Sequence, residues 1–479
     1  MSLSTIDIAV ILFYFVIVIA IGLIVSRKAK TAQEYLVAGR SLKMPMFVAT
    51  MAAVVIGGGT TLGTSELAYT HGVSGIWVGG MIAISIFLMS RLLETKLSNM
   101  RILSTSEAVG IFYGPGARSM SALVAIIYLF MIAVVQIVGI GTILQTVFGL
   151  GTIISLAIGA AIILAYLTLG GMVSVVYTDI FQFSVMTLGV VILGPIFALK
   201  SVGGFAGLQE ALPASYFDFG ALGINKVISY VLLFVPGMIV GQDVWQKAFT
   251  AESKKTSSRG TLLASIYIVI YVIGVIIIGM CLQVVNPNLT NPNLSFATAA
   301  MEFNPVGVRG LLLAALLAAI ISTANGCILG SSTVIYNDVL KPRMNIPKNK
   351  ELLVNRALAA MICLSALFVA MGLQSILRAL EVAHGYLAGC LFVPLVFAFL
   401  LKKVSAKAGL LSLAASAVTV TIFFIKDGIA ATTPISFGIM VSAVVFFGVN
   451  AFDRKKREFI FEGEKVIIDG QEQSLVKPD

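Results

Sequence analysis

The chain has 479 residues and a net charge of +10; 58% of its residues are hydrophobic and 11% charged, and its mean hydropathy is +1.02. This balance excludes a soluble globular protein and places the chain in a lipid bilayer. Because one span needs about 20 apolar residues, there is room for a dozen or so spans and not for a large extramembrane enzyme domain. The four cysteines lie in apolar runs without CxxC spacing, which predicts neither a disulfide framework nor a soft-metal site.

Apolar runs bounded by charged residues, Pro or Gly predict thirteen transmembrane helices. In chain order they cover about residues 6–26, 45–70, 72–93, 118–146, 150–170, 176–199, 224–250, 260–285, 308–335, 355–374, 375–401, 406–425 and 433–452. No Lys or Arg precedes the first run, which indicates a retained helix rather than a cleaved signal peptide. The sequence thus predicts one all-α, polytopic transmembrane domain over residues 1–452 and a solvated cytoplasmic tail over residues 453–479.

The excess of basic residues predicts membrane orientation rather than nucleic-acid binding. When the predicted loops are assigned alternately to the two sides, 27 of the 32 basic residues fall on one side. The other side has Lys200, Lys226, Arg309, Arg378 and Lys426. Because basic residues gather on the cytoplasmic side, the N-terminus is predicted to lie outside and the C-terminus inside.

Two of the predicted helices are interrupted in mid-membrane. The second contains Gly57, Gly58 and Gly59, each of which costs a helix roughly 0.8–1 kcal/mol relative to Ala. The seventh contains Pro236-Gly237 and then Gly241, and a proline removes an intrahelical hydrogen bond. Each interrupted helix opens a block of five spans, over residues 45–199 and 224–401, which is typical of an inverted-repeat transporter with a midplane site. The alternative is that the glycines only allow close helix packing.

Several segments, in order along nearly the whole chain, resemble the sodium:solute symporter family. They are Glu34-Tyr35-Leu36-Val37-Ala38-Gly39-Arg40-Ser41, the glycine-rich second helix, Gly170-Gly171 with Tyr177-Thr178-Asp179-Ile180-Phe181-Gln182, and Ala319-Ile320-Ile321-Ser322-Thr323. The resemblance implies a LeuT-type fold: a five-plus-five inverted repeat with one extra N-terminal helix (6–26) and two extra C-terminal helices (406–452). It also implies coupled uptake of a small organic solute with sodium.

Two adjacent hydroxyl side chains, Ser322 and Thr323, lie in the middle of the apolar ninth helix. Sodium is a hard cation that needs oxygen ligands, so these residues are candidate ligands. The alternative is that these hydroxyls bond to the carbonyl one turn earlier in their own helix or hydrogen-bond to a neighbouring helix. The family resemblance implies a site made of five residues: Ala53, Ile56, Ala319, Ser322 and Thr323.

Asp179 is a candidate for a second cation site, because some members of the family use a matching aspartate together with two further hydroxyls. In this chain Asn325 and Gly326 stand where those hydroxyls would be. One sodium per transport cycle is therefore predicted, with Asp179 and Asn325 either as part of a second site or as structural residues; for Asp179 a helix cap is the alternative.

The solute is expected between the two breaks. The candidate binding residues are Gly57, Thr60, Gln136, Gly241, Gln242 and Asp243. Ionisable groups within a membrane are costly and therefore functional candidates, and Asp243 would favour a solute with an amine or quaternary nitrogen. Its alternative role is a salt bridge to Lys247, one turn further on. Glu66, Glu381 and His384 are further polar residues of open function.

Local sequence in the second helix and around Asp179 is most similar to the high-affinity choline transporter branch of the family. That branch has tryptophans where this chain has Val55 and Gly241, which disfavours choline itself. An amino acid, amine or carboxylic metabolite is the predicted solute. The alternatives are a proton-coupled symporter of the same fold, a sensor or a channel. No enzymatic activity, cofactor, nucleic acid or obligate protein partner is predicted, and the expected location is a bacterial plasma membrane.

Overall fold

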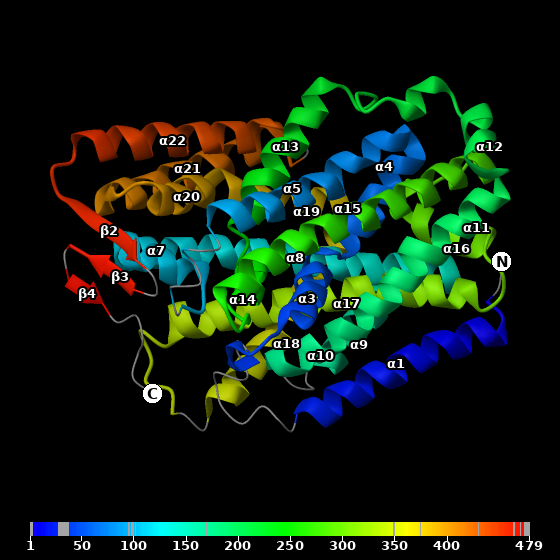
Figure 1. Ribbon diagram of the computed structural model, residues 1–479, viewed down its shortest axis with the longest axis horizontal. Coiled ribbons are helices and arrows are strands. Elements are labelled where there is room, and N and C mark those ends of the chain that lie inside the picture. Colours follow the sequence, from blue (N-terminus) through cyan, green and yellow to red (C-terminus); the bar gives the residue numbers. More distant parts are fainter. Residues whose placement is uncertain are drawn as a thin grey trace.

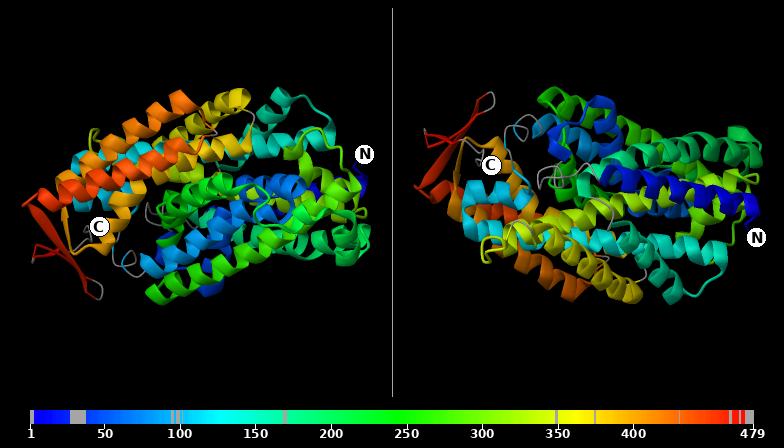
Figure 2. Two further views of the ribbon diagram at one scale, coloured as in Figure 1. Left: turned by 90° about the horizontal axis from the view of Figure 1, so that it is seen from above. Right: turned by 90° about the horizontal axis from the view of Figure 1, so that it is seen from below.

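The computed structural model describes residues 3–26, 38–93, 96, 100, 102–167, 171–347, 350–373, 375–429, 431–462, 465–469 and 471–473. Long helices run roughly along the longest axis of the molecule (Figure 1). The N-terminus lies at one end of this axis and a small β-sheet at the other, which we call the sheet end (Figures 1 and 2). The motif residues 34–37, Gly170 and residues 474–479 of the predicted tail lie outside the described residues.

The elements of the first half follow the predicted order. They are α1 (Thr5–Ser26), η1 (Ala38–Arg40), α3 (Met44–Val55), η2 (Gly59–Gly63), α4 (Thr64–His71), η3 (Gly72–Gly75), α5 (Ile76–Leu92), α7 (Thr105–Tyr113), α8 (Pro115–Phe148), α9 (Thr152–Leu167), α10 (Gly171–Met186), η4 (Thr187–Leu193) and α11 (Gly194–Ser201). Helix α1 is anchored by Asp7, whose Oδ1 accepts the amides of Gly307 at 2.7 Å and Gly310 at 3.1 Å.

The second half repeats the pattern of a broken helix followed by long ones. Its elements are α12 (Gly204–Ala211), η5 (Ala214–Phe217), α13 (Ile224–Ile239), α14 (Gln242–Ala248), α15 (Lys254–Val285), η6 (Pro292–Leu294), α16 (Ser295–Glu302), α17 (Val308–Val334), η7 (Ile335–Leu340), α18 (Glu351–Leu373), α19 (Ile376–Tyr386), η9 (Leu387–Leu391), α20 (Phe392–Leu400), α21 (Ala406–Asp427) and α22 (Thr433–Phe452). The predominantly helical fold is as predicted.

Eleven helical stretches of the described chain are long and apolar enough to cross a membrane, and the shorter Met44–Val55 and Thr152–Leu164 are also apolar. One of the eleven, Gly59–Leu92, contains a chain reversal at Gly72, whose φ of 61° suits glycine. Beyond it α5 folds back, because Gly75 packs on Ala68 and Gly79 packs on Thr60. The stretch Gly59–Leu92 is therefore two antiparallel helical segments, α4 before Gly72 and α5 after it. The count of thirteen spans and their orientation remain predictions.

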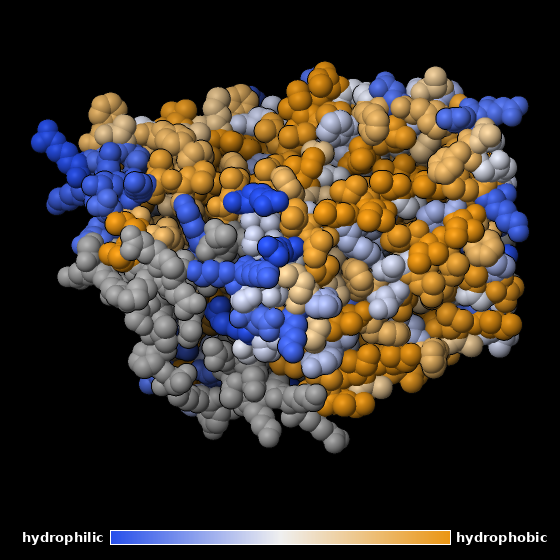
Figure 3. Space-filling view, in the orientation of Figure 1, coloured by the Kyte–Doolittle hydropathy of each residue, from blue (hydrophilic) through white to orange (hydrophobic). Residues whose placement is uncertain are grey.

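Burial divides the helices into an inner and an outer set. In α17 every residue from Leu312 to Val334 is buried, which agrees with the absence of an amphipathic pattern in this helix. Large apolar side chains are exposed on α1, α15, α18 and α22, including Phe13, Ile270, Phe368 and Val444. The space-filling view shows apolar residues over most of one face, with hydrophilic residues gathered mainly toward the sheet end (Figure 3). This distribution is that of a membrane protein whose outer helices face lipid.

The C-terminal region differs from the predicted solvated tail, since it forms strands. A four-stranded antiparallel sheet has the order β1 (Lys403–Ser405), β2 (Lys456–Glu462), β3 (Lys465–Ile468) and β4 (Gln471–Gln473), with Val404 opposite Arg457 and Ile460 opposite Ile467. Phe459 is buried, and its ring centroid lies 4.7 Å from that of Phe112 in α7. Apolar residues in alternation along β2 thus attach this segment to the helical body.

Candidate functional site

The first helix break lies where the three glycines predict it. Helix α3 ends at Val55, and Ile56 has non-helical angles of φ −88° and ψ 81°. The backbone groups released by the break find specific partners: the Gly58 amide donates to Gln136 Oε1 at 2.9 Å, and Thr60 Oγ1 donates to the Val55 carbonyl at 2.6 Å. Since unpaired backbone groups are costly in a membrane, these side chains stabilise the interruption.

The second break lies a turn beyond the proline that suggested it. Pro236 is accommodated within α13, and the helix is interrupted at Val240 and Gly241 before α14 begins. The indole Nε1 of Trp245 donates to the Ile239 carbonyl at 2.9 Å. The break is therefore held by a side chain from the helix that follows it, a contact that sequence spacing did not reveal.

One of the predicted cation ligands on the ninth predicted helix, Thr323, lies against the first break. Thr323 Oγ1 donates to the Val54 carbonyl at 2.9 Å, and a methyl group added to Gly57 would lie only 2.5 Å from that Oγ1. The regular bond from the Ile56 amide to the Ala52 carbonyl is followed by one from the Thr61 amide to the Gly57 carbonyl. The structure thus brings the ninth predicted helix and the break into direct contact.

Ser322 belongs to a buried polar cluster around Asp179, together with Thr50 and Lys247. Its Oγ donates to Asp179 Oδ1 at 2.5 Å, and Thr50 Oγ1 donates to Oδ2 at 2.5 Å. The ammonium Nζ of Lys247 lies 2.6 Å from Asp179 Oδ2 and 2.8 Å from Thr50 Oγ1, with the lysine side chain 1% exposed. Lys247 therefore pairs with Asp179 and not with Asp243, which answers the question that the sequence left open. Within the α10 helix Asp179 is an ion-pair partner, not a helix cap.

Asn325 is buried on α17, and neither its Oδ1 nor its Nδ2 has a hydrogen-bond partner in the described chain. The structure therefore does not bring this amide into hydrogen-bonding contact with Asp179. Ala319, one turn before Thr323, is fully buried on the same helix.

A small cavity lies between the two breaks. Its lining residues are Val54, Val55, Gly57, Gly59, Thr60, Ile82, Tyr128, Ile132, Gln136, Met238, Asp243, Thr323, Leu380 and His384. Of the six predicted solute-binding residues, Gly57, Thr60, Gln136 and Asp243 line it. Gly241 does not, although it lies next to Asp243 and Tyr128. Gln242 faces away, because its Oε1 accepts the amide of Thr105 at 2.7 Å.

Tyr128 and Ile132 are lining residues that the sequence reasoning missed. They precede the predicted Gln136 by eight and four residues in one unbroken helix, α8, and so lie on the same face. Tracing that face upstream from Gln136 would have identified Tyr128. Its hydroxyl donates to Asp243 Oδ1 at 3.0 Å, which ties α8 to the second break.

Known protein families include one whose sequence model covers most of this chain. The model of the sodium:solute symporter family matches residues 35–415. The chain belongs to this family. Its function is therefore the sodium-coupled symport of a small solute by a multi-pass membrane protein.

The relatives of this symporter are distant. It is 25% identical to a sodium/glucose cotransporter of Vibrio parahaemolyticus, over 87% of this chain and 84% of the relative. It is 26% identical to a sodium/pantothenate symporter of Haemophilus influenzae, over 73% and 75% of the two chains. Its fold matches a substrate-bound, outward-open Na⁺-coupled sialic acid symporter with a TM-score of 0.80 at 18% identity, covering 95% of this chain and 99% of the other.

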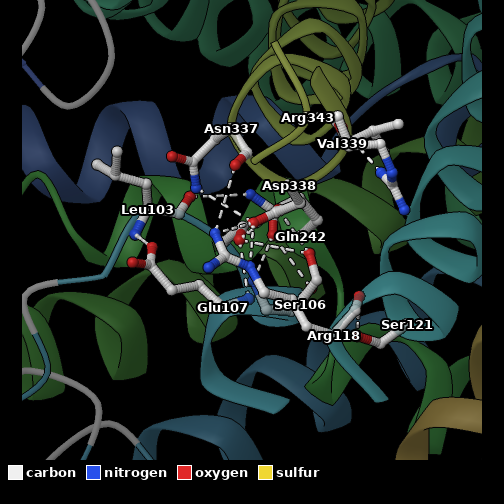
Figure 4. A network of polar contacts seen from close by, with 12 residues as sticks. Leu103, Ser106, Glu107, Arg118, Ser121, Gln242, Asn337, Asp338, Val339 and Arg343 are labelled. Carbon is white, nitrogen blue, oxygen red and sulfur yellow. Dashed lines mark hydrogen bonds and ion pairs between the residues drawn. The ribbon is translucent and has the colours of Figure 1, made fainter. Parts of the chain in front are cut away.

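At the sheet end of the symporter, a network of polar contacts surrounds Asp338 of η7 (Figure 4). Arg118 Nε donates to Asp338 Oδ1 at 2.9 Å, while the hydroxyls of Ser104 and Ser106 donate to Oδ2 at 2.7 and 2.8 Å. Ser104 also caps α7, since its Oγ accepts the Glu107 amide at 3.0 Å. The network joins α7, α8 and the end of the α17 helix.

The same end also links the two broken helices. Gln242, at the start of α14, donates from Nε2 to the Leu103 carbonyl at 3.2 Å. The Leu42 amide, just before α3, donates to the Thr250 carbonyl at 3.0 Å, and the Glu252 amide donates to the Leu42 carbonyl at 3.1 Å. A pathway from the cavity to the sheet end must separate these contacts.

We expect Asp338→Asn to open this end more often, because the neutral amide loses the charge-assisted bonds from Arg118. The expected result is faster maleimide labelling of Cys327, whose Sγ lies 4.0 Å from Asp243 Oδ2, in a background with Cys281, Cys363 and Cys390 changed to Ser. Glu351→Gln is the matched control, since its bond to Lys341 is 3.9 Å long and partly exposed. An unchanged rate in Asp338→Asn would show that the network does not restrain opening.

Proposed function

We propose that the symporter couples one sodium ion to each solute molecule by alternating access, with sodium bound by Ala53, Ile56, Ala319, Ser322 and Thr323. The contact between Thr323 and the interrupted turn at Val54 carries this proposal, because hydroxyls and released carbonyls together supply the hard oxygen ligands that sodium prefers. The solute binds in the adjacent cavity, which Thr323 and Gly57 also line. Sodium binding and solute binding thereby share the same turn.

A stoichiometry of one is supported by the ion pair at Asp179. A second sodium would need negative charge to offset its dehydration, but the Asp179 carboxylate already contacts the Lys247 ammonium at 2.6 Å. Asn325, where a second hydroxyl would be expected, makes no contact with this carboxylate within hydrogen-bond distance. With a neutral solute, one sodium carries one charge, which at about 2.3 kcal/mol per 100 mV supports roughly a 50-fold solute gradient.

The solute class proposed from the sequence is an amino acid, amine or carboxylic metabolite. The sugar and pantothenate named for the two relatives are further candidate solutes. Local sequence also favours membership of the choline transporter branch of the family. The protein is placed in a plasma membrane, with thirteen spans, its N-terminus outside and its sheet end facing the cytoplasm. The placement of basic residues supports this orientation.

Uptake into liposomes tests sodium coupling. Because the solute is not known, radioactive candidates from these classes are offered to the purified protein with an inward sodium gradient, a pH gradient, or neither. We expect accumulation with the sodium gradient alone. Accumulation that follows only the pH gradient would favour the proton-coupled alternative, and unsaturable flux would favour a channel.

Thr323→Ala should raise the sodium concentration for half-maximal uptake at least tenfold, because it removes a proposed ligand together with a hydroxyl that contacts the broken turn. Thr333→Ala is the matched control: it removes a buried hydroxyl from the same helix, where Oγ1 donates to the Leu329 carbonyl of its own helix at 2.8 Å. We expect this control to change sodium dependence less than twofold. Equal effects of the two substitutions would argue against a sodium site at Thr323.

A further inference from the structure

The cavity contains a buried carboxylate without a cationic partner. Asp243 is 3% exposed, and no Lys, Arg or His nitrogen of the described chain lies within ion-pair distance of it. Lys247, the neighbour expected to neutralise it, contacts Asp179 and Thr50 instead. A buried charge without a counter-ion is expensive, so a ligand that supplies the opposite charge would be stabilised here. Extending the proposed function, we infer that the solute supplies it: the symporter transports a small molecule that carries a protonated amine.

The other polar groups of the cavity are already occupied, which makes Asp243 more significant. Gln136 Oε1 accepts the Gly58 amide, Thr60 Oγ1 donates to Val55, and Thr323 Oγ1 donates to Val54. Two lining groups, Asp243 and His384, can form further polar contacts. The Asp243 carboxylate accepts from the Tyr128 hydroxyl at 3.0 Å and lies 4.0 Å from the Cys327 thiol, so these partners leave its charge unpaired; His384 has a buried Nδ1 without a partner in the described chain. The cavity thus offers an anion and one further hydrogen-bonding group.

The shape and chemistry of the walls fit such a solute. The rings of Tyr128 and His384 lie with centroids 5.3 Å apart next to Asp243, and an ammonium group is attracted to aromatic faces. The remaining walls are aliphatic, including Ile82, Met238 and Leu380, and suit a short hydrocarbon portion. None of the lining residues is Lys or Arg, so a carboxylate on the solute would have no cationic partner there.

Two further carboxylates, Glu66 and Glu381, lie on helices α4 and α19. Glu381 of α19 pairs with Lys226 at 2.9 Å, while Glu66 of α4 has a buried Oε2 without a partner in the described chain. A cationic solute with one sodium would carry two charges per cycle.

The experiment uses thermal unfolding of the purified full-length protein with a defined panel of probes. The amines are ethylamine, propylamine and ethanolamine; their counterparts are ethanol, propanol, propionate and glucose, each in sodium chloride and in potassium chloride. We expect at least one amine to stabilise the protein in sodium, and its neutral counterpart to have no effect. No stabilisation by any amine, or stabilisation by propionate or glucose instead, would overturn the inference.

Asp243→Asn should weaken the response to the amine at least tenfold while leaving stabilisation by sodium alone in place. Asp243→Glu retains the charge, so it should recover part of the amine response if the substitution is tolerated. Glu210→Gln, on the exposed face of α12, controls for the change in net charge. An amine response that survives Asp243→Asn would refute the role of this carboxylate. Loss of sodium dependence in the unmodified protein would instead refute the proposed sodium coupling, so the two failures are distinguishable.

Discussion

Replacing Lys247 by Met is expected to lower the free energy of unfolding by about 3–5 kcal/mol, because it leaves the Asp179 carboxylate buried without its counter-ion. Asp179 is 0% exposed, and its other hydrogen-bond partners among the described residues are the hydroxyls of Thr50 and Ser322. Denaturant unfolding of the purified protein in detergent measures the loss. Both members of this pair are almost fully buried, so removing either one leaves the other without a counter-ion.

A second substitution separates the charge effect from the loss of packing. In Lys247→Met/Asp179→Asn the uncompensated charge is gone, so we expect most of the lost stability to return. Sodium should also restore part of the stability of the single variant, because a carboxylate and two hydroxyls are suitable sodium ligands, whereas N-methylglucamine should not. If the single and double variants are equally unstable and neither responds to sodium, packing of the lysine stem explains the effect instead.

Gly57→Ala is expected to abolish transport. The added methyl group would lie 2.5 Å from Thr323 Oγ1, 2.8 Å from its Cβ and 2.9 Å from its Cγ2, so rotation of the threonine side chain cannot relieve the overlap. The broken turn and α17 must therefore separate, which displaces the proposed sodium ligands and the cavity wall together. Sodium-driven uptake into liposomes measures the loss, with a reduction of at least a hundredfold expected.

Gly63→Ala is the matched control for this effect. It lies in the same broken helix, but its methyl group would meet a flexible leucine end, Cδ2 of Leu377, at 3.2 Å. We expect less than a threefold change in uptake and little change in stability. Similar losses in both variants would indicate that helix flexibility, and not the contact with Thr323, requires the glycines.

Much of the helical architecture is predictable from local sequence. Apolar runs and flanking charges determine spans, since a chain in lipid must satisfy its backbone bonds within helices. The three glycines locate the first break for the same reason. The position of the second break is harder to predict from local sequence. Pro236 remains helical, and the interruption falls at Val240 and Gly241. There the Trp245 indole donates to the released carbonyl of Ile239.

The strands after residue 455 could not be predicted in this way. The segment from Lys456 to Glu462 is short and mixes charged with apolar residues, and it pairs with β1 and packs Phe459 on Phe112. These partners lie about 50 and 350 residues earlier in the chain. Similarly, Gln242 is next to a predicted site residue, but its amide is used at the sheet end by Thr105.

The sequence by itself determined that this protein is a membrane transporter with two interrupted helices, because burial in lipid imposes strong and local demands on composition and backbone. Only the tertiary structure decided how its buried charges pair. Sequence spacing favours Asp243 with Lys247, four residues apart on one helix. In the fold α10 and α14 both pack against α3 and α17, which brings Asp179 to the lysine, while α8 brings Tyr128 to Asp243. Coulomb energy in a low-dielectric interior depends on distance in space, so this exchange of partners frees Asp243 for the solute.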